Sequence, residues 1–175
     1  MATTKILMIE CMAEDHEDES AFLERLLGML KKGSCNIKRI KVGTRAALLT
    51  KLKGIAAEDW DHVHISAHGE DHEFFCVGDD LVSAVDFPSD CFEDSVVTIS
   101  ACGLGRADFT RELSSQTGAK AIVAPLHDVE MTHAAMFYCL FYYLVVVAGM
   151  SSAGAFERTK VALDKKALGG FGYFH

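Results

Sequence analysis

The chain has 175 residues, a formal net charge of −8, and a composition that is 50% hydrophobic with only 2 prolines. This length suits one domain, residues 1–175, with a sizeable core, and the composition argues against a disordered chain. The acidic charge, without a basic stripe, argues against nucleic acid as a partner.

The start of the chain and the six cysteines indicate where the protein resides. The opening Met1-Ala2-Thr3-Thr4-Lys5 runs straight into a strand, without the basic and apolar regions of a signal peptide. Most of the cysteines lie inside apolar runs, where they behave as small buried hydrophobic residues. We therefore expect a reducing, cytoplasmic compartment.

Strands and amphipathic helices alternate in the first third of the chain. Strands are expected at 6–9 and 37–42. A helix between them, capped by Ser20 and ended by Gly33, is predicted by the helical spacing of Leu23, Leu26, Leu27 and Leu30. The acidic run 14–19 lacks the alternating ligands and the glycine of a calcium loop, so we interpret it as a solvated loop.

The alternation continues to the end of the chain and predicts a doubly wound sheet with right-handed crossovers. Helices are expected at 45–55, at 109–116, at 132–150 and from Ser151 or Ser152 to about residue 168. Gly118 ends the second of these helices. The remaining elements are short strands at 74–77, 81–85 and 121–124, a hairpin turn at Gly78-Asp79-Asp80, and a loop at 169–172.

Two further strands carry the strongest functional signal. Residues 96–105, V-V-T-I-S-A-C-G-L-G, form an apolar run that ends in Cys102. Residues 61–69, D-H-V-H-I-S-A-H-G, form another that ends in His68 and Gly69. Because ligands bind at the carboxyl ends of strands in open α/β sheets, we expect the imidazole and the thiol to lie side by side.

This pair suits nucleophilic catalysis. A free thiol is mostly protonated at neutral pH, and only the thiolate attacks. His68 would take the proton from Cys102 and return it later to the leaving amine. The backbone N–H groups of Gly69 and Cys102 would form an oxyanion hole.

These residues resemble those of the caspase-like cysteine peptidases of clan CD, which have the caspase–haemoglobinase fold. The motifs S-A-H-G-E and T-I-S-A-C are most similar to the bacterial CHAT-type domains. Residues 118–123 (G-A-K-A-I-V) resemble the family's G-A strand, 134–138 (A-A-M-F-Y) its A-A-x-F-Y helix, and 149–151 (G-M-S) its G-x-S turn. The resemblance spans roughly residues 61–163, and it implies a three-layer α/β fold whose mostly parallel sheet has helices on both faces.

The resemblance implies a cysteine endopeptidase that cleaves protein substrates, with Cys102 as nucleophile, His68 as base and acid, and no cofactor. His127 stands where many relatives carry a tryptophan. It is a candidate for substrate binding, together with the acidic residues Asp79, Asp80, Asp86 and Asp128. An acidic pocket made by these aspartates would favour arginine or lysine before the scissile bond, and the alternative is that they are surface charges.

Other functions stay open on the sequence alone. A catalytically silent interaction module of the same fold is the first alternative. A metal-dependent hydrolase is a weaker one, because His62, His64, His68 and His72 could imitate a zinc cluster although no H-E-x-x-H motif occurs. The pattern G-x-G-x-x-D after Cys102 has aspartate where a dinucleotide fingerprint needs glycine, so nucleotide binding is weaker still.

Residues 134–150 contain no charged side chain. The run is at the lower limit for a membrane span and has three tyrosines, so a buried helix is the better interpretation, without a membrane. A helix that covers one sheet face should keep a polar outer stripe, and this one has none. We therefore expect a homo-oligomer or a partner chain to contact this helix.

Overall fold

A six-stranded sheet forms the centre of the protein, which was analysed as a computed structural model that describes residues 3–12, 19–30, 35–55, 58–70, 74–163 and 170–175. The strands are ordered β2-β1-β3-β7-β8-β9, and all neighbours are parallel except β8 and β9. Their bounds are β1 Thr4–Glu10, β2 Cys35–Lys41, β3 His62–Ser66, β7 Val96–Ser100, β8 Ala121–Pro125 and β9 Phe171–Phe174.

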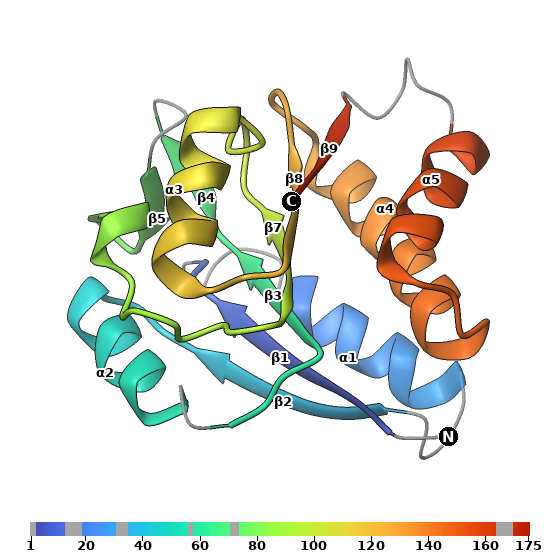
Figure 1. Ribbon diagram of the computed structural model, residues 1–175, viewed down its shortest axis with the longest axis horizontal. Coiled ribbons are helices and arrows are strands. Elements are labelled where there is room, and N and C mark those ends of the chain that lie inside the picture. Colours follow the sequence, from blue (N-terminus) through green and yellow to red (C-terminus); the bar gives the residue numbers. More distant parts are fainter. Residues whose placement is uncertain (1–2, 13–18, 31–34, 56–57, 71–73, 164–169) are drawn as a thin grey trace.

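Helices cover both faces of this sheet (Figure 1). On one face lie α2 (Arg45–Ile55) and α3 (Ala107–Thr117), and on the other lie α1 (Glu19–Leu30), α4 (Met131–Tyr142) and α5 (Ser152–Ala162). Side chains alternate along a strand, so Leu7 and Ile9 of β1 pack on the α2 side and Ile6 and Met8 on the α4 side. The predicted three-layer α/β fold is confirmed.

The predicted ends of the helices agree with the structure in part. Gly118 caps α3 in the left-handed conformation with φ 72°, and the Ser151 side chain caps α5 by accepting a hydrogen bond from the Gly154 backbone N–H at 3.2 Å. The predicted cap Ser20 instead lies inside α1, which begins at Glu19, and the predicted helix end at Gly33 lies outside the described residues. The prediction that α5 reaches residue 168 is wrong in its described part, since α5 ends at Ala162; residues 164–169 lie outside the described residues.

The end of the chain contains a strand where the sequence predicts a loop. Strand β9 pairs antiparallel with β8, and Gly172 lies opposite Ala124. The ring of Phe171 stacks on Phe137 of α4, with ring centroids 3.8 Å apart. The three aromatic residues of β9 favour a strand, but the glycines at 169, 170 and 172 hid this signal in the sequence, and the pairing with β8 shows it.

A second, smaller antiparallel sheet follows β3. It consists of β4 (His68–Glu70), β5 (Phe74–Val77) and β6 (Asp80–Ser83). The predicted hairpin turn at Gly78 and Asp79 is confirmed, but the strand after it ends at Ser83 and continues as the 3₁₀ turn η1 (Ala84–Asp86). His68 and Gly69, which the sequence places at the end of the apolar run 61–69, lie in the edge strand β4, where they pair with β5.

The uncharged run 134–150 is not one continuous α-helix. Helix α4 ends at Tyr142 and continues as the π-helical turn η2 (Tyr143–Val147). Two of the three tyrosine hydroxyl groups in this run face inward: Tyr142 Oη lies 2.7 Å from Thr98 Oγ1, and Tyr138 Oη donates to the Ile99 carbonyl. The sheet face beneath this helix carries polar groups beside its apolar side chains, which explains why the buried side of the helix carries tyrosines.

The outer side of α4 and η2 keeps apolar side chains in solvent, since Met136 of α4 is 55% and Tyr143 of η2 is 40% exposed. Contact of this helix with another chain stays a prediction. Within the described residues, none of the helices has the length and apolar character that crossing a membrane requires.

The buried ring of His62 makes the stability of the fold depend on pH. Burial against Phe141 and Tyr142 lowers the pKa of His62 from 6.5 to about 4, although Asp61 acts in the opposite direction. Between these values the unfolded chain binds a proton that the folded protein does not. The contribution of neutral His62 to the free energy of unfolding is therefore complete above pH 6.5 and is lost as the pH falls towards 4.

We expect the free energy of unfolding to fall by about 2 kcal/mol between pH 7 and pH 5 because of this residue. His62→Phe removes the titrating group and keeps an aromatic ring at the site, so the variant should lose less stability over the same range. Urea unfolding at the two pH values measures the difference. His133→Phe, on the outer part of α4, is the control, and an equal loss in wild type and His62→Phe would contradict the assignment.

Candidate active site

The two strands that carry the predicted dyad are neighbours in the sheet. Strand β3 pairs with β7 in parallel, with Ser66 opposite Ser100, and the Ala67 backbone N–H donates to the Ser100 carbonyl at 3.0 Å. His68 and Cys102 each follow their paired serine by two residues. Both residues line a pocket of about 250 Å³ at the carboxyl ends of the strands. His68 is exposed and Cys102 is half-buried, so a substrate can reach both.

Gly69 packs directly against the backbone of Cys102. A Cβ atom added to Gly69 would lie 2.0 Å from the Cys102 carbonyl oxygen and 3.1 Å from its backbone nitrogen. Only a glycine allows this approach, because a side chain would force the two backbones apart. The structure therefore brings together the backbones of the two residues whose N–H groups are predicted to form the oxyanion hole.

The loop after β8 closes the other side of the pocket. The Gly103 backbone N–H donates to the His127 carbonyl at 3.2 Å, and the Gly105 N–H donates to the Pro125 carbonyl at 2.7 Å. The Cys102 thiol donates to the Val129 carbonyl, with 3.6 Å between sulfur and oxygen. These contacts attach the segment that contains Cys102 to the neighbouring strand and restrict its position.

A buried carboxyl group lines this pocket at a position where the sequence predicts a solvated loop. Glu19, which was assigned to a solvated acidic loop, is only 4% exposed and lines the pocket from the first turn of α1. Its Oε2 accepts a hydrogen bond from Ser66 Oγ at 2.9 Å and lies 3.8 Å from His64 Nε2. Glu19 lies four residues before Leu23, so the spacing of the apolar helix face could have indicated that its side chain points inward.

The aspartates predicted to form an acidic specificity pocket do not line the pocket at Cys102. Asp80 Oδ2 accepts from the Arg45 backbone N–H at 2.8 Å, and Asp86 Oδ1 pairs with Arg45 Nη2 at 2.5 Å. Partial burial opposes ionisation of Asp86, but hydrogen bonds from Arg45 and Ser83 lower its pKa below the ordinary value. Asp79 is exposed in the β5–β6 turn.

The other two substrate-binding candidates lie in the loop after β8. His127 and Asp128 have exposed side chains, and their loop reaches the Cys102 segment through the His127 carbonyl. Neither His127 nor any of the predicted acidic candidates is among the described residues that line the pocket at Cys102. The acidic residue among those lining residues is Glu19.

The histidines of the metal alternative are used inside the core. His62 and His64 contact the rings of α4, and His64 Nδ1 lies 2.8 Å from Thr98 Oγ1. In the described ranges of the chain, no three histidine, cysteine or acidic side chains gather as metal ligands do. His72, the fourth histidine of that alternative, lies outside the described residues.

All six cysteines are unpaired. Burial raises the pKa of the thiols of Cys11 and Cys91 to about 12 and that of Cys139 to about 11. Burial also raises the pKa of Cys35 and Cys76. These five thiols are therefore poor nucleophiles near neutral pH.

Comparison with known proteins supports the fold. The crystal structure of gingipain R, described as an Arg-specific cysteine proteinase, is similar to 95% of this chain with a TM-score of 0.61 and 12% sequence identity. The chain spans 45% of the length of that structure. No protein-family profile matches the chain, and no curated protein matches it in sequence. The likeness and the sheet topology together show the caspase-like α/β fold that the sequence predicts.

Proposed function

We propose that this chain is a cysteine endopeptidase in which Cys102 is the nucleophile and His68 is the general base and acid. The main support is that β3 and β7 end in register at one pocket. His68 follows Ser66 by two residues, and Cys102 follows the paired Ser100 by two residues. The structural likeness to a cysteine proteinase agrees with this chemistry. The order of the two motifs, H-G and then A-C, supports the proposal that this chain is most similar to the CHAT-type domains among the caspase-like peptidases.

The reaction follows from the chemistry of the pair. His68 accepts the thiol proton, and the Cys102 thiolate attacks the carbonyl carbon of the scissile bond. The C–N bond then breaks, and His68 gives the proton to the leaving amine. The remaining thioester is hydrolysed when water loses a proton to His68 and attacks the same carbon, which releases the acid and returns the thiol.

The negative charge that develops on the carbonyl oxygen needs hydrogen-bond donors. The backbone N–H groups of Gly69 and Cys102 take this role in the proposal. The close approach of Gly69 to the Cys102 backbone supports it, since donors held by packed backbones need no rearrangement during the reaction. Six unpaired cysteines fit a reducing compartment, so a cytoplasmic location belongs to the proposal.

The proposal predicts that Cys102 reacts with a small alkylating reagent in a way that depends on His68. At pH 6 an ordinary thiol is less than about 1% thiolate, whereas a thiol that transfers its proton to a neighbouring imidazole is far more reactive. Iodoacetamide should therefore alkylate Cys102 first, and His68→Ala should slow that reaction at least ~10-fold. Peptide mapping by mass spectrometry measures the modification of each cysteine.

The control is His127→Ala, which removes an exposed histidine from the loop beside the Cys102 segment. It should leave the rate of Cys102 alkylation unchanged. Equal rates in wild type and His68→Ala would contradict the dyad and favour a catalytically silent interaction module.

A further inference from the structure

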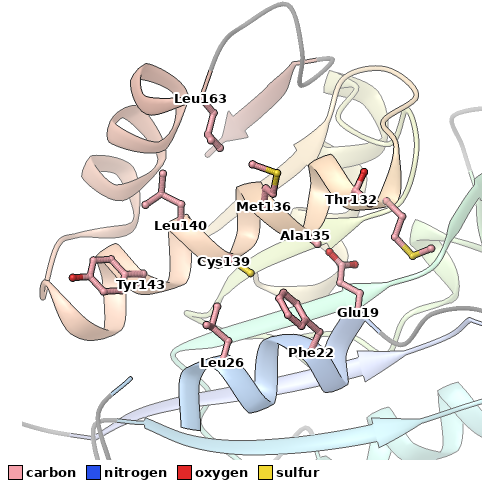
Figure 2. A pocket seen from close by; sticks show the side chains of 11 residues that line it. Glu19, Phe22, Leu26, Thr132, Ala135, Met136, Cys139, Leu140, Tyr143 and Leu163 are labelled. Carbon is pink, nitrogen blue, oxygen red and sulfur yellow. The ribbon is translucent and has the colours of Figure 1, made fainter. Parts of the chain in front are cut away.

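A large apolar groove runs over the exposed face of α4 (Figure 2). Helix α1 borders it on one side, and Leu163, which follows α5, borders it on the other. Its volume is about 870 Å³, compared with about 250 Å³ for the pocket at Cys102. Its walls include the apolar side chains of Phe22, Leu26, Met136, Leu140 and Tyr143.

The groove adjoins the pocket that contains the dyad. Glu19 and Met131 line both cavities, so one wall is shared between them. Glu19 lies in the first turn of α1, and its carboxyl group points towards Ala135 of α4 (Figure 2). A peptide chain whose scissile bond lies at Cys102 would therefore pass Glu19 as it enters the groove.

The shared wall carries an unsatisfied hydrogen-bond acceptor. Glu19 is 4% exposed, and its Oε2 accepts from Ser66 Oγ. Its other oxygen, Oε1, has no hydrogen-bond partner among the described residues. A buried carboxylate oxygen without a donor is unfavourable, so a peptide N–H group that reaches Oε1 when the Glu19 side chain turns towards the groove is favoured.

From this arrangement we infer that the groove binds the substrate beside the scissile bond and selects peptides with large apolar side chains there. Leucine, phenylalanine or methionine side chains fill the groove, and an N–H group of the same peptide donates to Glu19 Oε1 after the Glu19 side chain turns towards the groove. The exposure of Phe22 (54%) and Met136 (55%) is then reduced when the substrate is bound. This inference rests on the proposed function, because it gives the substrate class of the same site.

The test compares two sets of tetrapeptide acyloxymethyl ketones. The Cys102 sulfur bonds to the methylene carbon of the ketone, and the acyloxy group leaves as a carboxylate. One set has Leu-Phe-Leu before the last residue and the other has Ser-Asn-Ser, and each set is made with Arg, Leu, Asp and Ala at the last position. The second-order rate of Cys102 modification is measured by mass spectrometry. We expect the apolar set to react at least ~10-fold faster for matched last residues.

Two variants place a charge on opposite walls of the groove. Phe22→Asp and Met136→Asp change side chains that are already more than half exposed, so both variants should fold. Each should reduce the rate ratio between the apolar and polar sets several-fold. Met29→Asp is the matched control on α1, because Met29 is 76% exposed and outside the groove, and it should keep the wild-type ratio.

The outcomes separate this inference from the proposed function. Equal rates for the two sets, with alkylation of Cys102 that still depends on His68, would overturn the inference alone. Failure of every probe, together with alkylation that ignores His68, would overturn both. A dimer in sedimentation that Phe22→Asp converts to a monomer without changing the rate ratio would show that a second copy fills the groove, and the inference would be wrong.

Discussion

Replacement of Cys102 by alanine is expected to abolish peptide cleavage completely. The variant keeps the backbone of the pocket but has no sulfur to attack the scissile carbonyl, and among the described residues that line this pocket no other is a cysteine. His68→Ala keeps the nucleophile and loses the proton transfer, so it should reduce kcat/KM by at least ~10²-fold. Hydrolysis of a fluorogenic peptide library measures both effects.

Cys35→Ala is the matched control for this experiment. Cys35 begins β2, a strand at the outer edge of the six-stranded sheet, and does not line the pocket. Its replacement should leave cleavage unchanged. Cleavage by Cys102→Ala at the wild-type rate would overturn the peptidase proposal, because the reaction would then use a different group.

The second large loss of turnover is expected from the substitution Gly69→Ala. The added methyl group would lie 2.0 Å from the Cys102 carbonyl oxygen, well below the distance that two such atoms can share. The backbone of Cys102 must move, and a displacement of about 1 Å at a reacting group can cost on the order of 10²-fold in rate. We therefore expect turnover to fall at least ~10²-fold, through misplacement of both the thiol and the oxyanion donors.

Gly54→Ala is the control for the added methyl group. Gly54 lies in α2, and a Cβ there meets no atom within 4 Å, so the change should leave turnover as in the wild type. Thermal unfolding of both variants shows whether each is folded. Wild-type turnover in a folded Gly69→Ala variant would mean that this backbone contact has no role in the reaction.

The His62 titration and the His68-dependent alkylation test different parts of the chain. His62 lies in β3 under α4, where its protonation state affects folding. His68 lies two residues beyond the end of that strand, at the pocket. A variant of His62 should therefore change the pH dependence of stability and leave the relative rate of Cys102 alkylation unchanged at pH 7.

The sequence predicted the strands and helices that carry the dyad because their signals are local. The continuous apolar run at 96–99 is typical of a strand buried on both faces, and Val96, Val97, Thr98 and Ile99 are at most 6% exposed. A strand that lies in the middle of a parallel sheet ends at the edge where ligands bind. The positions of His68 and Cys102 at one pocket followed from these two facts.

The residues that the sequence misplaced depend on contacts between distant segments. Glu19 belongs to a run of acidic residues, and only its packing on Ser66 of β3 buries its carboxyl group. The acidic residues Asp80 and Asp86 are candidates for a specificity pocket in the sequence, but in the structure both bind Arg45 at the start of α2. Composition does not reveal which charged side chain meets which partner, because that depends on the arrangement of loops in space.

By itself, the sequence determined the fold class and the places where β3 and β7 end, and so the positions of His68 and Cys102 at one pocket, because hydrophobic periodicity and residue type are properties of short segments. Only the tertiary structure decided that β9 joins the sheet, that two tyrosines of α4 meet polar groups of the sheet, and that an apolar groove adjoins the pocket through Glu19. Each of these depends on pairing between residues far apart in the chain, where the free energy gained by packing outweighs local preference.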